Sequence, residues 1–167
     1  VQAKRYYGSL YEPILFCVKD KNQYTFNSDD ILVDAKTGAQ RKLIDYRKVV
    51  PTTYNTKKVP GNVWEMPRVR YRMEEYEDHP TQKPEKLLAK IILASSNEGD
   101  FVFDPFLGSG TTAVVAKKLG RKFSGVELDE TFACIAQKRI ELAEADKSIQ
   151  GYEDGVFWER NSVSKRK

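Results

Sequence analysis

The stretch FVFDPFLGSGTT, residues 101–112, decides the fold because it joins an apolar run to a glycine-rich turn and a helix start. Phe101 to Asp104 form the apolar run, which is typical of a short strand. Gly108 and Gly110 allow a sharp turn and a close approach of the backbone to a ligand. The amides at the following helix start attract polar or anionic groups. The stretch therefore predicts a strand, a ligand-binding loop and a helix in direct succession.

A second strand and helix are expected immediately downstream. Residues 111–119 have helical character, and Gly120 is a natural stop. Residues 122–128 predict a strand, and residues 130–145 predict a helix. The apolar face of that last helix is predicted to consist of Phe132, Ile135, Ala136, Ile140 and Ala143. The order strand, loop, helix, strand, helix predicts one βαβ unit of a parallel, doubly wound sheet in an α/β fold.

Two further elements are expected upstream. A helix begins near Pro84, which suits a first helical turn, and ends at residues 97–100. Its predicted apolar face consists of Leu87, Leu88, Ile91, Ile92 and Ser95. In YEPILFCVK, residues 11–19, the continuous apolar run from residue 14 to residue 18 predicts a strand buried on both faces.

An acid after the second strand points to the kind of ligand. Glu127 lies 19 residues beyond Gly108. At about this spacing a carboxylate can accept both hydroxyls of a ribose, which favours a nucleoside-containing cofactor. Residues 108–113 also satisfy a loose dinucleotide pattern, so an NAD-dependent oxidoreductase is an alternative. A second alternative is that the glycines only form a tight turn and that Glu127 is a surface acid without a ligand.

Charge and cysteine content narrow the class of protein. The chain carries a net charge of +4, but residues 21–72 hold 11 Lys and Arg against 5 Asp and Glu. This basic block lacks clear periodicity, which is typical of a functional or disordered segment. Cys17 and Cys134 lie far apart and His79 is the single histidine, so neither a disulfide framework nor a metal site is expected. Without a long apolar run or signal segment, a cytoplasmic protein without membrane partners is expected.

Three motifs in this order carry a family resemblance: HPTQKP at residues 79–84, DPFLGSGTT at 104–112 and GVELD at 125–129. They resemble the amino-group DNA methyltransferases that use S-adenosyl-L-methionine, in the β-arranged subgroup. Residues 7–100 resemble more specifically the YhdJ family of orphan adenine-N6 methylases. The resemblance implies an incomplete Rossmann-like class I methyltransferase sheet with an inserted irregular target-recognition region. It divides the chain into a core strand segment (1–19), the target-recognition region (20–78) and a cofactor-binding βαβ half (79–145). The C-terminal tail (146–167) has no counterpart in the family, and its mostly polar sequence predicts that it is either flexible or docked through its apolar residues 156–158.

The resemblance implies that S-adenosyl-L-methionine binds around the glycine loop. Glu127 would hold the ribose hydroxyls, and the ammonium of Lys83 would neutralise the methionine carboxylate. The other implied cofactor residues are Thr81, Gln82, Asp104, Pro105, Phe106, Gly108, Ser109, Gly110, Thr111, Thr112 and Leu128. No residue of the chain is expected to be catalytic, and His79 is expected to be structural.

Family members hold the flipped base with an Asp/Asn/Ser-Pro-Pro-aromatic tetrapeptide, which occurs nowhere in the 167 residues. DPFL, residues 104–107, lacks the second proline and precedes the glycine turn, so Asp104 is assigned to the cofactor site. The chain is therefore expected to be the C-terminal portion of a methyltransferase, inactive alone and partnered by the missing N-terminal catalytic half. Because relatives of this arrangement often pair, a homodimer is a further expectation.

The basic block occupies the position of the family's target-recognition region. The residues expected to contact double-stranded DNA are Arg41, Lys42, Arg47, Lys48, Asn55, Lys57, Lys58, Arg68, Arg70 and Arg72. The whole enzyme would turn adenine out of the duplex and methylate its N6 nitrogen. A cytosine-N4 methyltransferase and a non-catalytic DNA-binding relative are the remaining alternatives.

Overall fold

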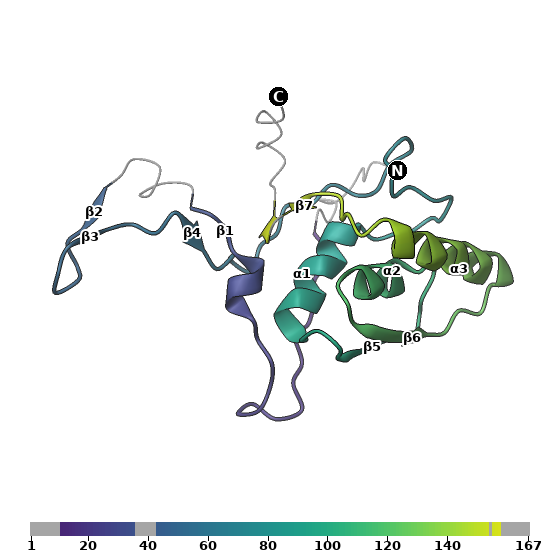
Figure 1. The fold of residues 1–167 in the computed structure, drawn as a ribbon, viewed down its shortest axis with the longest axis horizontal. Helices are drawn as coiled ribbons and strands as arrows, with labels where there is room; N and C mark the ends of the chain where they lie inside the picture. The colour runs from purple at the N-terminus through teal and green to yellow at the C-terminus, as the bar shows by residue number, and fades with distance from the viewer. Residues whose placement is uncertain (1–10, 36–42, 154, 158–167) are drawn as a thin grey trace, which may run out of the picture.

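The structure, a computed structural model, describes residues 11–35, 43–153 and 155–157. Figure 1 shows helices α1 to α3 beside the short sheet of β5 and β6, with β1 to β4 reaching away from them. The elements are η1 (Ser28–Ile31), β1 (Val33–Asp34), β2 (Ile44–Asp45), β3 (Thr52–Thr53), β4 (Lys57–Lys58), α1 (Glu85–Ser95), β5 (Phe101–Asp104), α2 (Thr111–Lys118), β6 (Lys122–Gly125), α3 (Glu130–Ala145), β7 (Tyr152–Glu153) and β8 (Val156–Phe157).

The predicted βαβ unit is confirmed. Strands β5 and β6 are parallel neighbours, paired from Phe101 with Lys122 to Asp104 with Gly125, and α2 connects them. The second strand is shorter than predicted because residues 126–128 leave the ladder after two further backbone bonds to residues 104 and 107. The glycine loop and the segment after β6 therefore lie side by side at the carboxyl edge of the sheet.

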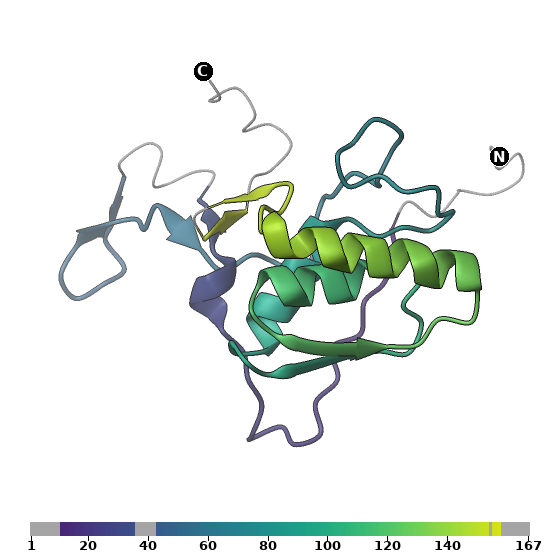
Figure 2. The ribbon, with the colours of Figure 1, turned by 45° about the vertical axis from the view of Figure 1, so that its right-hand side comes forward.

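The helices cover one face of this two-stranded sheet (Figure 2). Val102 and Phe123 turn inward and pack against the core. Phe101 and Phe103 point to the other face, where they are 63% and 56% exposed. A sheet of a doubly wound fold normally has both faces covered. Among the described residues, only one face of the β5–β6 sheet is covered.

The core also takes residues from the two flanking segments. Ile31 and Val33, from the polar block, and Ile149 and Phe157, from the tail, join the buried cluster around α1. The Nζ atom of Lys90 lies 5.0 Å from the ring centroids of both Trp64 and Phe157. The docking expected of residues 156–158 is thus observed for its described members, since Phe157 is only 3% exposed. Residue 158 lies outside the described residues.

The predicted apolar faces of the helices need correction. In α1, Pro84 is the N-cap, Ser95 is exposed, and the buried side chains include Glu85 and Lys90. In α3, Arg139 is buried between Ala136 and Ala143, while Ile140 is only half-buried. Hydropathy patterns missed these charged side chains because a remote partner is what makes the burial of a charge tolerable.

The strand predicted for residues 11–19 is wrong. Residues 11–18 have no regular backbone structure, and Leu15 and Phe16 are 85% and 58% exposed. Among the described residues, β5 pairs with β6 alone. A strand needs a neighbour for its N–H and C=O groups, and no described strand lies beside this segment to supply them.

Candidate cofactor site and nucleic-acid interface

Asp104, the last residue of β5, organises the glycine loop from within. Its Oδ1 atom accepts a hydrogen bond from the Phe106 N–H at 2.9 Å. Its Oδ2 atom accepts one from the Thr112 hydroxyl at 2.6 Å. Asp104 therefore ties the start of the loop to the first turn of α2, where a negative charge also interacts favourably with the helix dipole.

Glu127 reaches across from the end of β6 to the same loop. Its Oε2 atom accepts a hydrogen bond from the Gly108 N–H at 2.7 Å, and its Oε1 atom accepts one from the Asp129 N–H at 2.9 Å. The N–H groups of Asp129 and Gly108 lower the pKa of this carboxyl below its ordinary value. Each carboxylate oxygen retains capacity for another donor, because the two oxygens together offer about four acceptor sites.

The two loop glycines are required by close packing as well as by their backbone angles. Gly110 has a φ of +81°, and a Cβ atom there would lie 2.7 Å from the Cβ of Ala136. Gly108 has a φ of +55°, and a Cβ atom would lie 3.1 Å from Nε2 of His79. The His79 ring in turn packs against Phe132, with 4.3 Å between the ring centroids. His79 thus covers the glycine loop.

The HPTQKP segment is held by its own polar side chains. Gln82 accepts a hydrogen bond from the Glu77 N–H at 2.8 Å and donates one to the Glu75 carbonyl. The Thr81 N–H donates to Nδ1 of His79 at 3.3 Å. Because its amide is occupied by these two bonds to the preceding residues, Gln82 shapes the loop rather than presenting a free group.

Lys83 differs from these neighbours because its ammonium remains accessible. Its Nζ atom lies 2.7 Å from Oε2 of Glu12, and the two side chains are 48% and 79% exposed. An exposed ion pair of this kind contributes little to stability and exchanges readily for another anion. Lys83 is therefore available to a carboxylate ligand.

Apolar side chains flank the carboxyl edge of the sheet. Phe106, which follows β5, is 88% exposed, and Leu128, which follows β6, is fully exposed. Pro105 is also exposed. Exposed apolar groups beside a set of polar acceptors are typical of a site that binds a partly apolar ligand such as a nucleoside.

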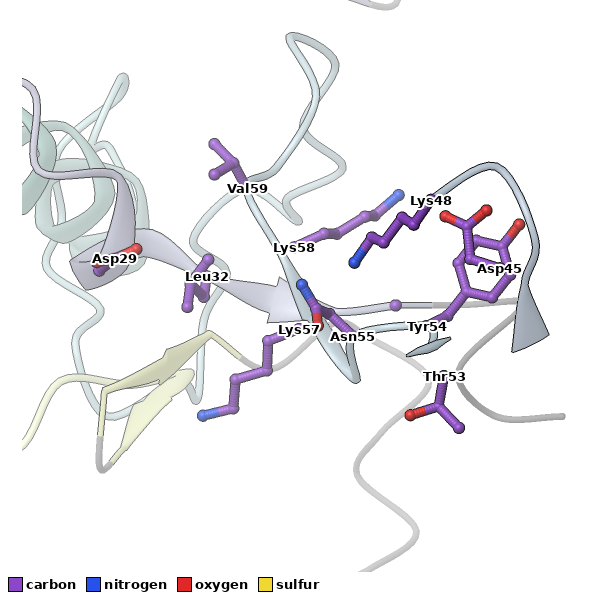
Figure 3. Close-up of a pocket in the computed structure, with 11 residues that line it drawn as sticks. Asp29, Leu32, Asp45, Lys48, Thr53, Tyr54, Asn55, Lys57, Lys58 and Val59 are labelled. Carbon is purple, nitrogen blue, oxygen red and sulfur yellow. The ribbon is translucent and has the colours of Figure 1, made fainter. Parts of the chain in front are cut away.

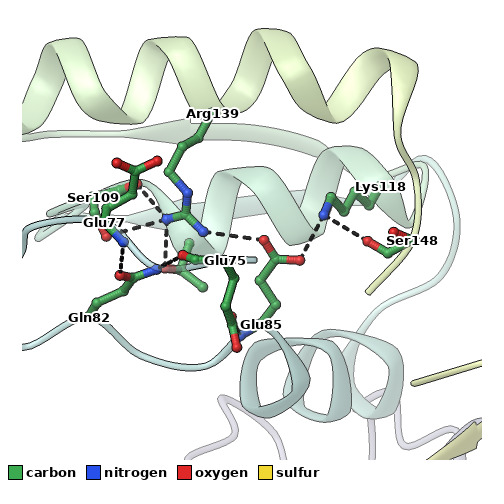
Figure 4. A network of polar contacts seen from close by, with 9 residues as sticks. Glu75, Glu77, Gln82, Glu85, Ser109, Lys118, Arg139 and Ser148 are labelled. Carbon is green, nitrogen blue, oxygen red and sulfur yellow. Dashed lines mark hydrogen bonds and ion pairs between the residues drawn. The ribbon is translucent and has the colours of Figure 1, made fainter. Parts of the chain in front are cut away.

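Ser109 and Thr111 face the interior instead. Both are buried, at 3% and 6% exposure, and both contact the guanidinium of Arg139 (Figure 4). Sequence reasoning did not single out Arg139, nor Glu85, which pairs with it at 3.2 Å. A signal was available, because Arg139 stands between two alanines, Ala136 and Ala143, on the buried face of α3.

A second candidate site lies in the basic block. A cleft of about 540 Å³ runs between the β1–β4 and β2–β3 ladders (Figure 3). Of the predicted DNA-contacting residues, the structure gathers four along this cleft: Lys48, Asn55, Lys57 and Lys58. All four are exposed. The ammonium groups and the amide can contact phosphates and base edges, respectively.

The other predicted DNA-contacting residues that the structure describes do not line the cleft. The Arg47 guanidinium is bound to Asp45, with 2.9 Å between Nε and Oδ1, and this hydrogen bond lowers the pKa of Asp45 to about 2. Arg68, Arg70 and Arg72 are exposed on an irregular segment. Two predicted residues, Arg41 and Lys42, lie outside the described residues.

A parallel βαβ unit that brings a glycine loop and an acid together defines a class of nucleoside-binding α/β proteins. Comparison with known proteins narrows the class: the family model described as DNA methylase, N6_N4_Mtase, matches residues 1–138. The chain belongs to this DNA methylase family.

Its relatives are longer proteins. The chain is 63% identical over 143 residues to the DNA adenine methyltransferase YhdJ of Escherichia coli (strain K12), covering 86% of this chain and 49% of the relative. It is 39% identical over 137 residues to the type II methyltransferase M.HpaI of Haemophilus parainfluenzae, covering 82% and 40%. Among solved structures, an M1.HpyAVI–SAM complex matches with 30% identity and a TM-score of 0.48, covering 73% of this chain and 46% of that one. The chain spans about half the length of these relatives, or less.

Cys17 and Cys134 are free thiols, and both are exposed. No helix in the described part of the chain is long and apolar enough to cross a membrane.

Proposed function

We propose that this chain is the cofactor-binding and DNA-recognition part of a methyltransferase that transfers a methyl group from S-adenosyl-L-methionine to adenine N6 in double-stranded DNA. The observation that carries the proposal is the contact of Glu127 with the Gly108 N–H at the carboxyl ends of two parallel strands. This is the edge at which α/β proteins of this kind bind nucleotides.

The donor and acceptor set fits S-adenosyl-L-methionine. Glu127 has a lowered pKa, so it is ionised at neutral pH and can accept hydrogen bonds from ribose hydroxyls. Phe106 and Leu128 offer apolar surface to the adenine ring. Lys83 can exchange Glu12 for the carboxylate of the methionine part. When bound, the cofactor supplies a methyl group activated by its sulfonium.

Within this chain, the remaining residues position rather than react. Asp104 and the two loop glycines shape the cradle, and His79 covers it on the side of Phe132. Positioning of reactants can lower a barrier by roughly 7 to 11 kcal/mol. We therefore assign no nucleophile and no general base to the chain.

Residues 20–78 are proposed to be the target-recognition region. The lysines of the cleft, together with Asn55, would contact phosphates and base edges of the duplex. Adenine is proposed over cytosine because the 63% identical relative is a DNA adenine methyltransferase.

Catalysis is proposed to require a second part, the portion of the relatives that this chain does not match. That part would supply the Asp/Asn/Ser-Pro-Pro-aromatic motif and complete a Rossmann-like sheet. Two observations support such a partner. Phe101 and Phe103 are exposed on the uncovered face of the sheet, and among the described residues β5 pairs with only one strand, β6. Pairing of two such assemblies is a further proposal.

Calorimetry with S-adenosyl-L-methionine tests the cofactor site. It is run on the chain alone and on the chain mixed with the unmatched part of the YhdJ relative. We expect Glu127→Ala to weaken uptake at least tenfold, while Glu141→Ala, which removes an exposed carboxylate on α3, leaves it unchanged. No uptake in either preparation, tighter binding of NAD, or uptake indifferent to Glu127→Ala would overturn the proposal.

Methyl transfer tests the activity. The same mixture is supplied with labelled S-adenosyl-L-methionine and duplexes that contain or lack adenine. We expect label in adenine N6 only when both parts are present. Label on cytosine N4 would favour the other branch of the family, and no label at saturating cofactor would favour a DNA-binding relative without transfer chemistry.

A further inference from the structure

A buried guanidinium lies directly beneath the glycine loop. Arg139 is 6% exposed. Its Nη1 atom donates to the Ser109 carbonyl at 2.7 Å, to the Ser109 hydroxyl at 3.3 Å and to the Thr111 hydroxyl at 3.1 Å (Figure 4). These contacts hold the loop at Ser109 and Thr111, while Glu127 holds it at the Gly108 N–H.

The guanidinium is itself held by a charged network. Its Nη2 atom lies 3.2 Å from Oε1 of Glu85, and Oε2 of Glu85 lies 2.8 Å from Nζ of Lys118. Lys118 also donates to the Ser148 carbonyl at 2.7 Å. The network therefore connects α1, α2, α3 and the segment after α3, and it leaves Arg139 little freedom to move.

The same network reaches the HPTQKP segment through Glu75. Oε2 of Glu75 accepts a hydrogen bond from the Glu85 N–H at 2.7 Å, and the Glu75 carbonyl accepts one from Gln82. Burial raises the pKa of the Glu75 carboxyl, and the charge of Glu85 adds to this effect. Gln82 directly precedes Lys83, so the glycine loop and the HPTQKP segment are both connected to Arg139.

Stability alone is a weak reason to keep such a network. The desolvation of buried ions often cancels their attraction, and apolar side chains of similar volume frequently serve as well. A planar guanidinium offers something that an apolar side chain lacks, which is several donors in fixed directions. Here those donors fix the direction of one loop carbonyl and two hydroxyls.

We propose that Arg139, held by Glu85, is a positioning residue that fixes the glycine loop so that the Gly108 N–H and Glu127 stay in register for the cofactor. This inference rests on the proposed cofactor site. It predicts that affinity for S-adenosyl-L-methionine depends on the guanidinium in molecules that are fully folded.

The test compares Arg139→Met and Arg139→Lys with Lys138→Met, a matched control at the adjacent, exposed position of α3. Thermal unfolding, calorimetry with S-adenosyl-L-methionine below the unfolding transition, and amide hydrogen exchange of the loop are measured on the chain and on its mixture with the unmatched part of YhdJ. We expect Arg139→Met to weaken binding at least tenfold per folded molecule and to speed exchange at residues 108–110. Arg139→Lys should be intermediate, because one ammonium cannot reach both Glu85 and the Ser109 carbonyl in the same directions.

A double variant, Glu85→Gln with Arg139→Met, separates positioning from stability and covers the case in which Arg139→Met does not fold. It removes the carboxylate charge that Arg139→Met deprives of one of its two cationic partners, and it keeps an amide oxygen as an acceptor for Lys118. We expect stability to recover toward that of the unaltered chain while binding stays weak. Recovery of affinity together with stability, or unchanged affinity in folded Arg139→Met, would overturn this inference alone. Absence of uptake by both the unaltered chain and Lys138→Met would overturn the proposed cofactor site as well.

Discussion

The helical unit, residues 85–145, and the basic arm, residues 43–72, are built in opposite ways. The helical unit joins a parallel ladder to three helices and buries charged side chains as ion pairs. The basic arm has ladders of two residues, and its buried side chain is Asp45. A cofactor site in the first can be pre-organised by the fold itself, whereas a DNA interface in the second would have to gain order on binding.

The largest effect is expected where a flanking segment joins the helical unit. Phe157 is 3% exposed in the core, whereas Phe106 is 88% exposed. Phe157→Ala should lower the free energy of unfolding by about 3 to 5 kcal/mol, because it removes a buried ring. Phe106→Ala should leave it unchanged. Denaturant unfolding measures both, and a small effect of Phe157→Ala would show that the tail is independent of the helices.

The next effect concerns the glycine loop. Gly110→Ala combines left-handed backbone strain with a clash against Ala136, so we expect a loss of about 2 to 4 kcal/mol in the free energy of unfolding. Gly99→Ala is the matched control, since Gly99 has a φ of +84° and open space around it. It should lose about 1 to 2 kcal/mol, from backbone strain alone. Equal losses in the two variants would argue against tight packing of the loop on α3.

A smaller effect, on binding rather than stability, is expected in the basic arm. Lys57→Ala with Lys58→Ala should weaken duplex DNA binding several-fold and reduce the slope of log affinity against log salt by about 2. The unfolding transition should not move, because both side chains are exposed. The control is Lys122→Ala with Lys138→Ala, which removes the same charge from the helical unit. If the control weakens binding equally, the cleft is not the DNA interface.

The smallest effect concerns the Asp45–Arg47 pair. The hydrogen bond from Arg47 lowers the pKa of Asp45 to about 2. A lowered carboxyl pKa means that the stabilisation is present above the ordinary value and is lost as the pH falls through about 2. We therefore expect the carboxylate of Asp45 to stay ionised at pH 3, as measured by carboxyl NMR titration. Arg47→Ala should return the titration to near 3.9.

The sequence predicted those parts of the site that depend on neighbours along the chain. Gly108, Gly110 and Glu127 were identified from spacing, and the structure brings them together at the end of the β5–β6 pair. Thr81, Gln82 and Lys83 were identified from the resemblance, and Gln82 proves to hold its own loop. The buried strand predicted at residues 11–19 failed because an apolar run describes a side chain's preference and not the presence of a pairing partner.

By itself, the sequence determined the order of strand, loop, helix, strand and helix in residues 101–145, because periodicity and glycine positions act through local geometry. Only the tertiary structure decided that Arg139 and Glu85 are buried beneath the loop. It also decided that Phe157 completes the core around α1. The physical reason is the same in each case: whether a charge or a ring can be buried depends on partners dozens of residues away, and no local pattern encodes where those partners will lie.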